Sequence, residues 1–383
     1  MNRDNLSALA VGIGVVSLIA GFGIYFNNPA LNKAASGQQD NNFVPATIVQ
    51  NGTTTKVHID KSQFKLAPEL AGISGYINTA DGEKLTLADL KGKVVIVDFW
   101  TYSCINCIRT IPYLNAWYDK YADKGLVIVG VHTPEFEFEK NYDNVKTAVE
   151  KFGIKYPVMQ DNNRDTWNAY QNRYWPHKYI VDDEGYIRYD HIGEGGYADT
   201  EKIIQSLLAE RAADMGANVT IDQSISTPEK AQGVDFGKIN TPELYFGYQY
   251  ARMPLGNSEG FKPDQTVKYT VPQDTNLVPS RIYLGGDWKN NADNMELQSD
   301  TGRVVLVYSA RAANIVAGGQ GTLHVSEDGA NMTAMGSDVS ESGRVTIDGQ
   351  KLYNLTMHDG YGEHTLVIDV TGKGFQIYTF TFG

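Results

Sequence analysis

The feature that most constrains this chain is a pair of cysteines, Cys104 and Cys107, which follow a strongly apolar segment. Residues 93–99 read KVVIVDF, a nearly continuous apolar run typical of a strand buried on both faces. The stretch from Cys104 to Tyr121 favours a helix, so the first cysteine falls at the helix N-terminus and the second lies one turn further in. This spacing brings both sulfur atoms to one side of the helix and allows a small disulfide ring to close.

The helix N-terminus gives the two thiols different tasks. Its unpaired N–H groups and the positive end of the helix dipole stabilise the thiolate of Cys104, which we expect to be the attacking nucleophile. Cys107 is placed to resolve the mixed disulfide by attacking the sulfur of Cys104 and releasing the reduced client. A CxxC pair without context also fits half a zinc site or two incidental thiols, so the surrounding sequence decides.

Composition excludes several other classes of protein. These are the only two cysteines among 383 residues, which excludes a scaffold stapled by disulfides, and no further ligands stand at zinc-site spacing. We therefore expect no metal and no cofactor. The formal net charge is −12 and the 33 Lys and Arg residues are scattered singly, so we expect no nucleic-acid partner.

The amino terminus contains an uncharged run of about 19 residues from Ala8 to Phe26, long enough to cross a bilayer as a helix. Arg3 precedes it, and the positive-inside tendency then keeps the N-terminus cytoplasmic and exports the remainder. We interpret the run as an uncleaved, single-pass anchor in the cell membrane, with the catalytic part on the extracytoplasmic side. A signal peptide cleaved near Ala34 to Ser36 and a buried core helix are the alternatives.

Between residues 66 and 212 strands alternate with helices, which predicts a layered α/β domain with a mainly parallel central sheet. The pattern predicts further strands at 126–131, 178–181 and 186–191, and helices at 141–152, 164–171 and 200–211. After residue 241 short β runs follow one another, separated by turn signals such as Asp328-Gly329 and Asp359-Gly360. These runs lie at 281–284, 303–308, 322–325, 344–347, 365–370 and 375–382 and predict an all-β, jelly-roll-like sandwich.

The length of 383 residues and the 42% hydrophobic content require more than one core, so we expect two folded domains with accessory segments. The predicted division is a cytoplasmic stub and transmembrane anchor at 1–27, a tether at 28–65, an α/β domain at 66–212, a linker at 213–241 and a β-sandwich domain at 242–383. We expect the last domain to fold independently and to be dispensable for the redox step.

The segment from Val97 to Cys107, with Pro112 further on, resembles the active-site segment of thioredoxin: a buried strand, an acidic residue, Phe-Trp, a short loop, CxxC and a helix that carries a proline. Trp175-Pro176 stands just before the strand at 178–181, where that fold carries a cis-proline opposite the disulfide. The resemblance covers about 145 residues. It implies a three-layer, thioredoxin-like α/β domain and a thiol-disulfide oxidoreductase.

The resemblance also implies roles for individual residues. Asp98 looks like the buried carboxylate that relays a proton for the resolving cysteine, although a strand-end Asp bonded to backbone would be merely structural. Trp100 is expected to pack under the redox loop. Trp175 and Pro176 would complete the substrate-binding surface, because a cis-proline leaves the backbone of Trp175 free to pair with an extended client chain. An ordinary turn proline is the alternative.

Two details point to a branch of the family. The inserted helix and strand before Trp175 resemble the exported TlpA and ResA type, and the loop sequence together with Leu244 to Gly247 looks like the soluble part of DipZ proteins. DipZ proteins carry a membrane electron-transfer module ahead of this part. Here a single span stands in its place, so the resemblance implies a separate membrane electron donor of CcdA type and clients that are exported protein disulfides or thiols. A reductase or isomerase is then expected rather than a primary oxidant.

The β domain resembles the carbohydrate-binding-module-like sandwich at the end of DipZ. Tyr245, Tyr248, Tyr250 and Trp288 would then supply stacking faces for a glycan or an anchor for a protein ligand, although aromatic filling of the core is the simpler interpretation. His358 and His364 lack a nearby cysteine or close carboxylate cluster in the sequence, so they are interpreted as ordinary surface or turn residues.

Two rival functions stay open. A peroxiredoxin-like thiol peroxidase is one, because Thr101 stands three residues before Cys104 as in the PxxxTxxC pattern, although Val97 occupies the place of its proline. The other is a cell-surface binding protein that acts through the β domain while the redox domain is vestigial. The intact set of Cys104, Cys107, Asp98 and Pro176 favours dithiol exchange over both.

Overall fold

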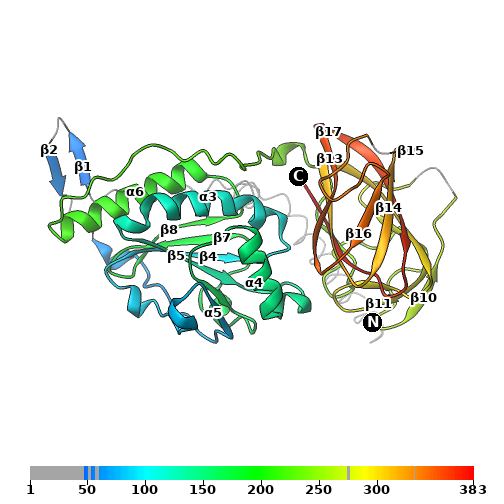
Figure 1. The fold of residues 1–383 in the computed structure, drawn as a ribbon, viewed down its shortest axis with the longest axis horizontal. Helices are drawn as coiled ribbons and strands as arrows, with labels where there is room; N and C mark the ends of the chain where they lie inside the picture. The colour runs from blue at the N-terminus through cyan, green and yellow to red at the C-terminus, as the bar shows by residue number, and fades with distance from the viewer. Residues whose placement is uncertain (1–46, 51–52, 57–59, 274–276, 332) are drawn as a thin grey trace, which may run out of the picture.

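The computed structural model describes residues 47–50, 53–56, 60–273, 277–331 and 333–383. A layered α/β half is followed by a β-rich half (Figure 1). The predicted span from Ala8 to Phe26 lies outside the described residues. Among the helices that are described, none has both the length and the apolar character needed to cross a bilayer.

The α/β half is built on a six-stranded sheet in the order β3–β6–β5–β4–β7–β8. Its strands are β3 (Gly75–Ile77), β4 (Val94–Trp100), β5 (Leu126–His132), β6 (Val158–Gln160), β7 (His177–Val181) and β8 (Ile187–Ile192). β4, β5 and β6 pair in parallel, whereas β3, β7 and β8 pair antiparallel with their neighbours. The prediction of a mainly parallel sheet is therefore wrong. The turn between β7 and β8 is too short for the crossover that a parallel pair needs.

Helices cover both faces of this sheet (Figure 1). They are α3 (Ile105–Tyr121), α4 (Tyr142–Lys151), α5 (Asp165–Ala169) and α6 (Tyr197–Asp214). Apolar side chains of α3, α4 and α6 share one core cluster with the sheet, and α5 packs in the cluster on the opposite face. The three-layer arrangement that the thioredoxin resemblance implies is thus confirmed. Six short 3-10 helices fill connections: η1 (Lys61–Gln63), η2 (Ala80–Gly82), η3 (Ala88–Leu90), η4 (Ala122–Lys124), η5 (Glu137–Lys140) and η6 (Phe236–Lys238).

The segment predicted to be an irregular tether contains regular structure. Strands β1 (Thr47–Gln50) and β2 (Thr53–Lys56) form an antiparallel pair. Further along, Leu66 forms a bridge with Tyr186, which attaches the start of the α/β half to the turn before β8. Apolar periodicity did not predict this strand pair, because the stretch has few apolar residues and backbone pairing does not require an apolar period.

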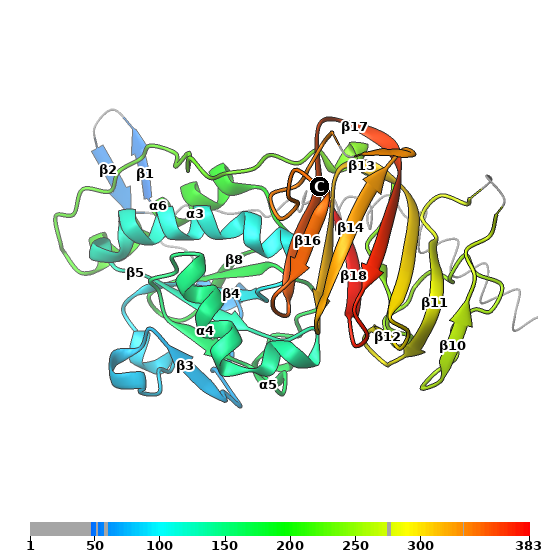
Figure 2. The ribbon, with the colours of Figure 1, turned by 45° about the vertical axis from the view of Figure 1, so that its right-hand side comes forward.

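The β-rich half is one antiparallel sheet of ten strands that curves around a single core (Figure 2). Its strands are β9 (Leu244–Tyr245), β10 (Thr266–Tyr269), β11 (Ile282–Asn290), β12 (Met295–Leu297), β13 (Thr301–Gly318), β14 (Gly321–Glu327), β15 (Ala330–Asn331), β16 (Arg344–Ile347), β17 (Lys351–Thr371) and β18 (Gln376–Phe382). All six predicted β runs coincide with strands. The two separate sheets expected for a sandwich are joined into one, because β13 and β17 run through both parts and bend at register shifts.

The two halves share a packed interface. Tyr378 of β18 packs its ring against Phe136 and Phe138, with centroid separations of 5.1 and 4.7 Å. The Tyr245 hydroxyl donates a hydrogen bond to Oε1 of Glu135 at 2.7 Å. Removing the β-rich half would therefore expose aromatic rings that are buried in the full chain.

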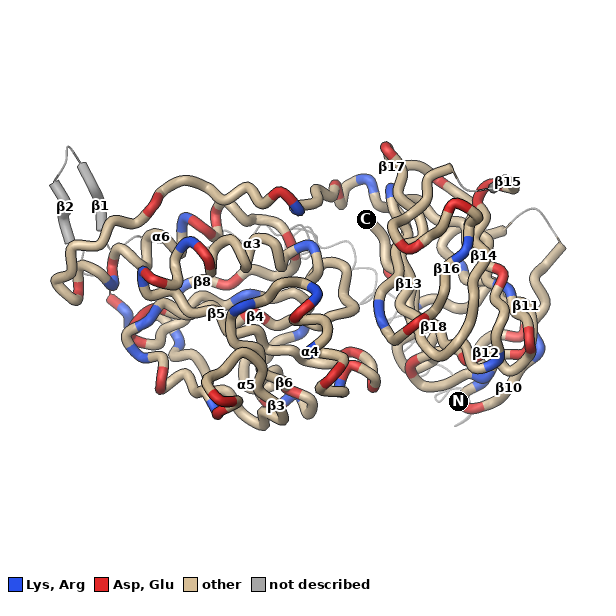
Figure 3. Tube along the Cα trace, in the orientation of Figure 1, with Lys and Arg blue, Asp and Glu red and all other residues tan. Residues whose placement is uncertain are grey.

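Charged residues of both signs are interspersed over the two halves (Figure 3). The shared interface described above is made largely by aromatic rings and hydroxyl groups. Apolar packing, which salt does not screen, thus supplies much of the attachment between the halves.

Candidate functional site

Cys104 ends the loop after β4 and caps α3. Its backbone is extended, with φ −76° and ψ 115°, and its Sγ accepts a hydrogen bond from the backbone N–H of Cys107 at 3.3 Å. The two thiols are not joined by a disulfide. Cys104 is partly exposed, whereas Cys107 is only 1% exposed. Only the first thiol can therefore meet a client, and a helix N–H already points at its sulfur, an arrangement that stabilises a thiolate.

Cys107 lies inside the core formed by α3 and the sheet. Burial and its hydrogen bond to Cys104 raise the pKa of the Cys107 thiol well above its ordinary value, and the charge of Asp98 adds to this effect. A backbone hydrogen bond from Thr101 to the sulfur acts in the opposite direction. Cys107 is thus held as a thiol and needs a base before it can attack a disulfide.

Asp98 is a buried carboxylate whose charge acts on Cys107. It sits near the end of β4, is 2% exposed, and one of its carboxylate oxygens, Oδ1, has no hydrogen-bond partner in the described part of the chain. Burial raises the pKa of Asp98 to about 7, while the Lys178 ammonium group opposes the shift. A carboxylate with that pKa can accept and return a proton near neutral pH. The alternative of a strand-end Asp saturated by backbone hydrogen bonds does not fit the orphaned oxygen.

Lys178 is a part of the site that the sequence analysis missed. It pairs with Asp98 across β4 and β7, is fully buried, and donates a hydrogen bond from Nζ to the carbonyl oxygen of Gly193 at 3.1 Å. Burial lowers the pKa of Lys178, and the charge of Asp98 acts against this. The available signal was a lysine in an otherwise apolar strand, since lysine is rarely buried without a partner.

The aromatic residues around the loop occupy different depths. Trp100 is 2% exposed and meets His132 edge-on at a centroid distance of 5.2 Å, so its ring is not available for direct contact with a client. Trp175 is only partly buried, and its Nε1 donates to the carbonyl oxygen of Thr133 at 3.0 Å. The peptide bond between Trp175 and Pro176 is cis, as the resemblance implies.

Arg109 does not offer its charge to Cys104. Its guanidinium group is buried and forms a salt bridge with Glu194 at 2.5 Å, and its Nη2 donates to Oδ1 of Asn106 at 2.7 Å. The cation is therefore neutralised within the protein. The polar contact at the Cys104 sulfur is instead the backbone N–H of Cys107.

A cavity of about 650 Å³ lies between α3 and the β-rich half. Ile105, next to Cys104, lines it together with Ile108 and Pro112 of α3. The opposite wall includes Ala312, Leu352 and Met357. The β-rich half thus forms part of the surface beside the exposed thiol, a feature that motif reasoning on α3 alone could not give.

The proposed stacking residues of the β-rich half are mostly not available to a ligand. Trp288 is fully buried and Tyr245 is 6% exposed, so both fill space inside the protein, as the simpler interpretation predicted. Tyr250 donates a hydrogen bond to the carbonyl oxygen of Glu135 at 3.0 Å and belongs to the interface between the halves. Tyr248 is partly exposed. The four rings therefore do not form one exposed surface on which a glycan could stack.

A thioredoxin-type sheet that carries a dithiol at the start of a helix is the framework of a disulfide-exchange protein. Two family models match the chain: residues 64–190 match the AhpC/TSA family, and residues 241–383 match the "Thioredoxin like C-terminal domain". The first match covers both cysteines and Pro176. The second match coincides with the β-rich half.

Curated relatives make the assignment specific. Thiol-disulfide oxidoreductase YkuV of Bacillus subtilis is 33% identical over 144 residues, which are 94% of YkuV and 37% of this chain. Thiol-disulfide oxidoreductase ResA of Bacillus thuringiensis is 30% identical over 135 residues, 74% of ResA and 35% of this chain. The chain therefore belongs to the thioredoxin-like family of thiol-disulfide oxidoreductases. Protein DipZ of Mycobacterium bovis is 36% identical over 317 residues, 83% of this chain but only 43% of DipZ, so the chain spans less than half the length of that relative.

We predict that Asp98→Asn slows the release of client from the mixed disulfide by about 10²-fold at pH 7, because the base that takes the Cys107 proton is lost. In the parent the rate should rise as pH increases through about 7, where Asp98 becomes charged. The measurement is stopped-flow resolution of a preformed mixed disulfide across pH 5 to 9. Asp119→Asn, which changes an exposed carboxylate of α3, the helix that carries Cys107, serves as the control. An unchanged pH profile in Asp98→Asn would contradict the role.

Proposed function

We propose that this protein is an extracytoplasmic thiol-disulfide oxidoreductase that exchanges disulfides with exported proteins. The observation that carries the proposal is the unequal burial of the two thiols, with Cys104 partly exposed at the N-terminus of α3 and Cys107 enclosed. A nucleophile must reach its client, whereas a resolving thiol must reach only the first sulfur atom.

The first step uses Cys104 alone. Its thiolate attacks one sulfur of a client disulfide, a new bond forms between that sulfur and Sγ of Cys104, and the client's sulfur–sulfur bond breaks. The second client sulfur leaves as a thiolate and takes a proton from solvent. In the mixed disulfide Sγ of Cys104 is neutral, so the favourable interaction between the helix N–H groups and a thiolate is lost. The mixed disulfide is therefore an intermediate.

The second step uses Cys107 and Asp98. Asp98 accepts the proton of the Cys107 thiol, and the Cys107 thiolate attacks Sγ of Cys104. The mixed disulfide breaks, the remaining client sulfur leaves as a thiolate, and a disulfide joins the two cysteines. The client has gained two electrons and the pair has lost two. Lys178 supports this step because its buried positive charge compensates the negative charge that develops beside Asp98.

The cycle then requires a reductant, and we propose a separate membrane donor of CcdA type that passes two electrons to the oxidised pair. The apolar run from Ala8 to Phe26 would anchor the chain and keep Cys104 near that donor, with the catalytic half outside the cytoplasm. The similarity to DipZ over 83% of this chain supports the same proposal. On this basis the protein acts as a reductase or isomerase.

The β-rich half would contribute to client binding. Its residues form one wall of the cavity next to Ile105, so a client segment that reaches Cys104 would lie against both halves. The interspersed charges of both halves fit clients of varied charge (Figure 3). A protein ligand of the β-rich half would, on this proposal, be a client segment that lies beside α3.

A peroxidase is the weaker alternative. The AhpC/TSA match includes Thr101, and the Thr101 hydroxyl is 3.3 Å from Nε2 of His132, a contact in which it is already engaged. Burial lowers the pKa of His132 to about 3, so the ring stays neutral in this contact. Cys107 within the same helix favours dithiol exchange.

We predict that Cys107→Ala accumulates mixed disulfides with exported proteins, because the thiol that breaks the covalent intermediate is missing. Cys104→Ala should trap none. The measurement is non-reducing electrophoresis of cells that express each variant, with mass spectrometry of the adducts. Adducts trapped through Cys107 in the Cys104→Ala variant would reverse the role assignment.

We predict a reduction potential for the Cys104–Cys107 pair near the thioredoxin value of about −270 mV. The reason is that the charge of Arg109, on the helix that Cys104 caps, is paired with Glu194 and so does little to stabilise the reduced form. Redox titration against glutathione or dithiothreitol buffers measures it. A potential near about −120 mV would make the protein a disulfide donor.

A further inference from the structure

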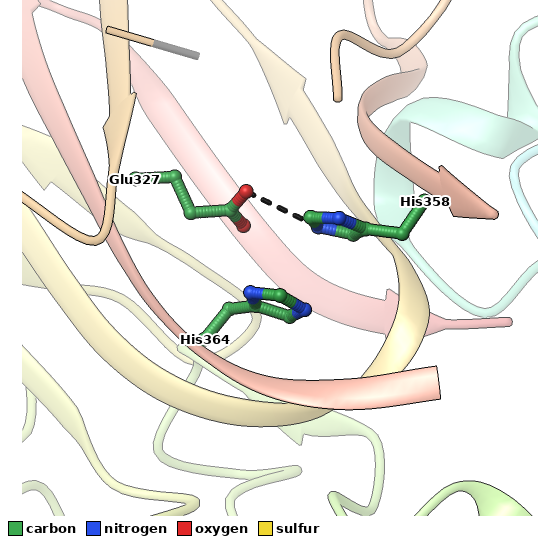
Figure 4. Close-up of side chains that lie close together, drawn as sticks. All are labelled: Glu327, His358 and His364. Atoms are coloured by element: carbon green, nitrogen blue, oxygen red, sulfur yellow. Dashed lines mark ion pairs between the residues drawn. The ribbon is translucent and has the colours of Figure 1, made fainter. Parts of the chain in front are cut away.

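The β-rich half contains a second cluster of chemically active side chains. Glu327 at the end of β14 and His358 and His364 of β17 point toward one another (Figure 4). One ligand atom from each of them lies within 4.8 Å of the others. Glu327 is more than 30 positions away from the two histidines in the sequence and lies beside them only through the pairing of β14 with β17.

Strand β17 brings its two histidines together by an irregularity. Ala310 of β13 pairs with Gly362, but Ala312 pairs with Met357, so residues 358–361 leave the regular ladder and return to it. His358 starts this excursion and His364 follows its end, where it pairs with Tyr308. Two side chains that are six positions apart thereby stack with ring centroids only 3.9 Å apart and planes 7° apart.

The spacing and hydrogen bonds of the cluster are similar to those of metal ligands in proteins. Nε2 of His358 lies 3.1 Å from Oε2 of Glu327, close to the separation of about 3.3 Å between two ligand atoms on a tetrahedral zinc ion. Nδ1 of His364 lies 2.9 Å from a carboxylate oxygen of Asp328, which leaves Nε2 of that ring for an ion. A carboxylate behind a metal-binding histidine is the usual way to fix its tautomer and orientation.

Glu327 is itself held in place. Its Oε1 accepts a hydrogen bond from the buried hydroxyl of Tyr308 at 2.7 Å, and its side chain is only 6% exposed. The two histidine side chains are 16% and 19% exposed, so the cluster is sheltered but open to a small ion from solvent.

We propose that Glu327, His358 and His364 bind a divalent transition-metal ion of the zinc class, with Asp328 and Tyr308 as positioning residues. Two imidazoles and one carboxylate suit zinc and leave a fourth position for water. The ion takes the place of the hydrogen bond between Glu327 and His358, and each imidazole binds it through a nitrogen that carries no proton. One of the stacked rings turns so that both nitrogen lone pairs converge on the ion. The ion then links His358 and His364, which flank the irregular segment of β17, to Glu327 of β14.

Isothermal titration with zinc chloride tests the proposal. The Cys104→Ser/Cys107→Ser form of the chain is used, because thiolates are competing zinc ligands. We expect one zinc ion per chain. The His358→Gln and His364→Gln variants should each weaken binding by more than 100-fold, and Asp328→Asn by about 10- to 100-fold. His324→Ala removes an exposed histidine of β14 outside the cluster and should leave the affinity unchanged.

Two further measurements guard against a variant that fails to fold. Circular dichroism and thermal unfolding of each metal-free variant check that the β-rich half is intact. X-ray absorption of the zinc-loaded Cys104→Ser/Cys107→Ser chain, which needs no cluster variant, should show two imidazoles in the first coordination sphere. An absence of zinc binding, a coordination sphere without imidazole, or unchanged affinity in folded His358→Gln and His364→Gln would overturn the proposal.

Discussion

The burial of Cys107 one turn inside α3, in electrostatic contact with Asp98 of β4, is the constraint on which the chemistry depends. Burial raises the pKa of both groups, and each shift has a use: the thiol stays protonated until it is needed, and the carboxylate can carry a proton near neutral pH. Lys178 on the neighbouring strand β7 interacts electrostatically with both Asp98 and Cys107. In the proposed mechanism the sheet therefore carries the proton acceptor as well as supporting the helix.

The β-rich half changes how the redox helix meets its surroundings. It packs Tyr378 on Phe136 and Phe138, and the hydroxyl of Tyr102 in the redox loop donates to the carbonyl oxygen of Gln350. The exposed thiol thus lies beside a wall that a single thioredoxin domain lacks. Such a wall restricts the directions from which a client can approach Cys104, and restricted approach is a physical source of selectivity.

The sequence predicted what depends on local pattern. The buried strand before the cysteines, the helix that Cys104 caps, and the β character of residues 242–383 all follow from periodicity and capping chemistry. Features that depend on partners far apart in the chain were not predictable. Lys178 opposite Asp98 and Glu327 beside the histidines arise from strand pairing, and pairing is invisible to periodicity. The parallel character of the sheet was overestimated for the same reason.

The unequal burial of the two thiols can be measured as the rate at which iodoacetamide alkylates each cysteine of the reduced, folded protein, read by peptide mass spectrometry. Burial of Cys107 and exposure of Cys104 predict that Cys104 reacts at least about tenfold faster, and that denaturation removes the difference. Equal rates in the folded protein, or faster modification of Cys107, would contradict the division of labour between the two thiols.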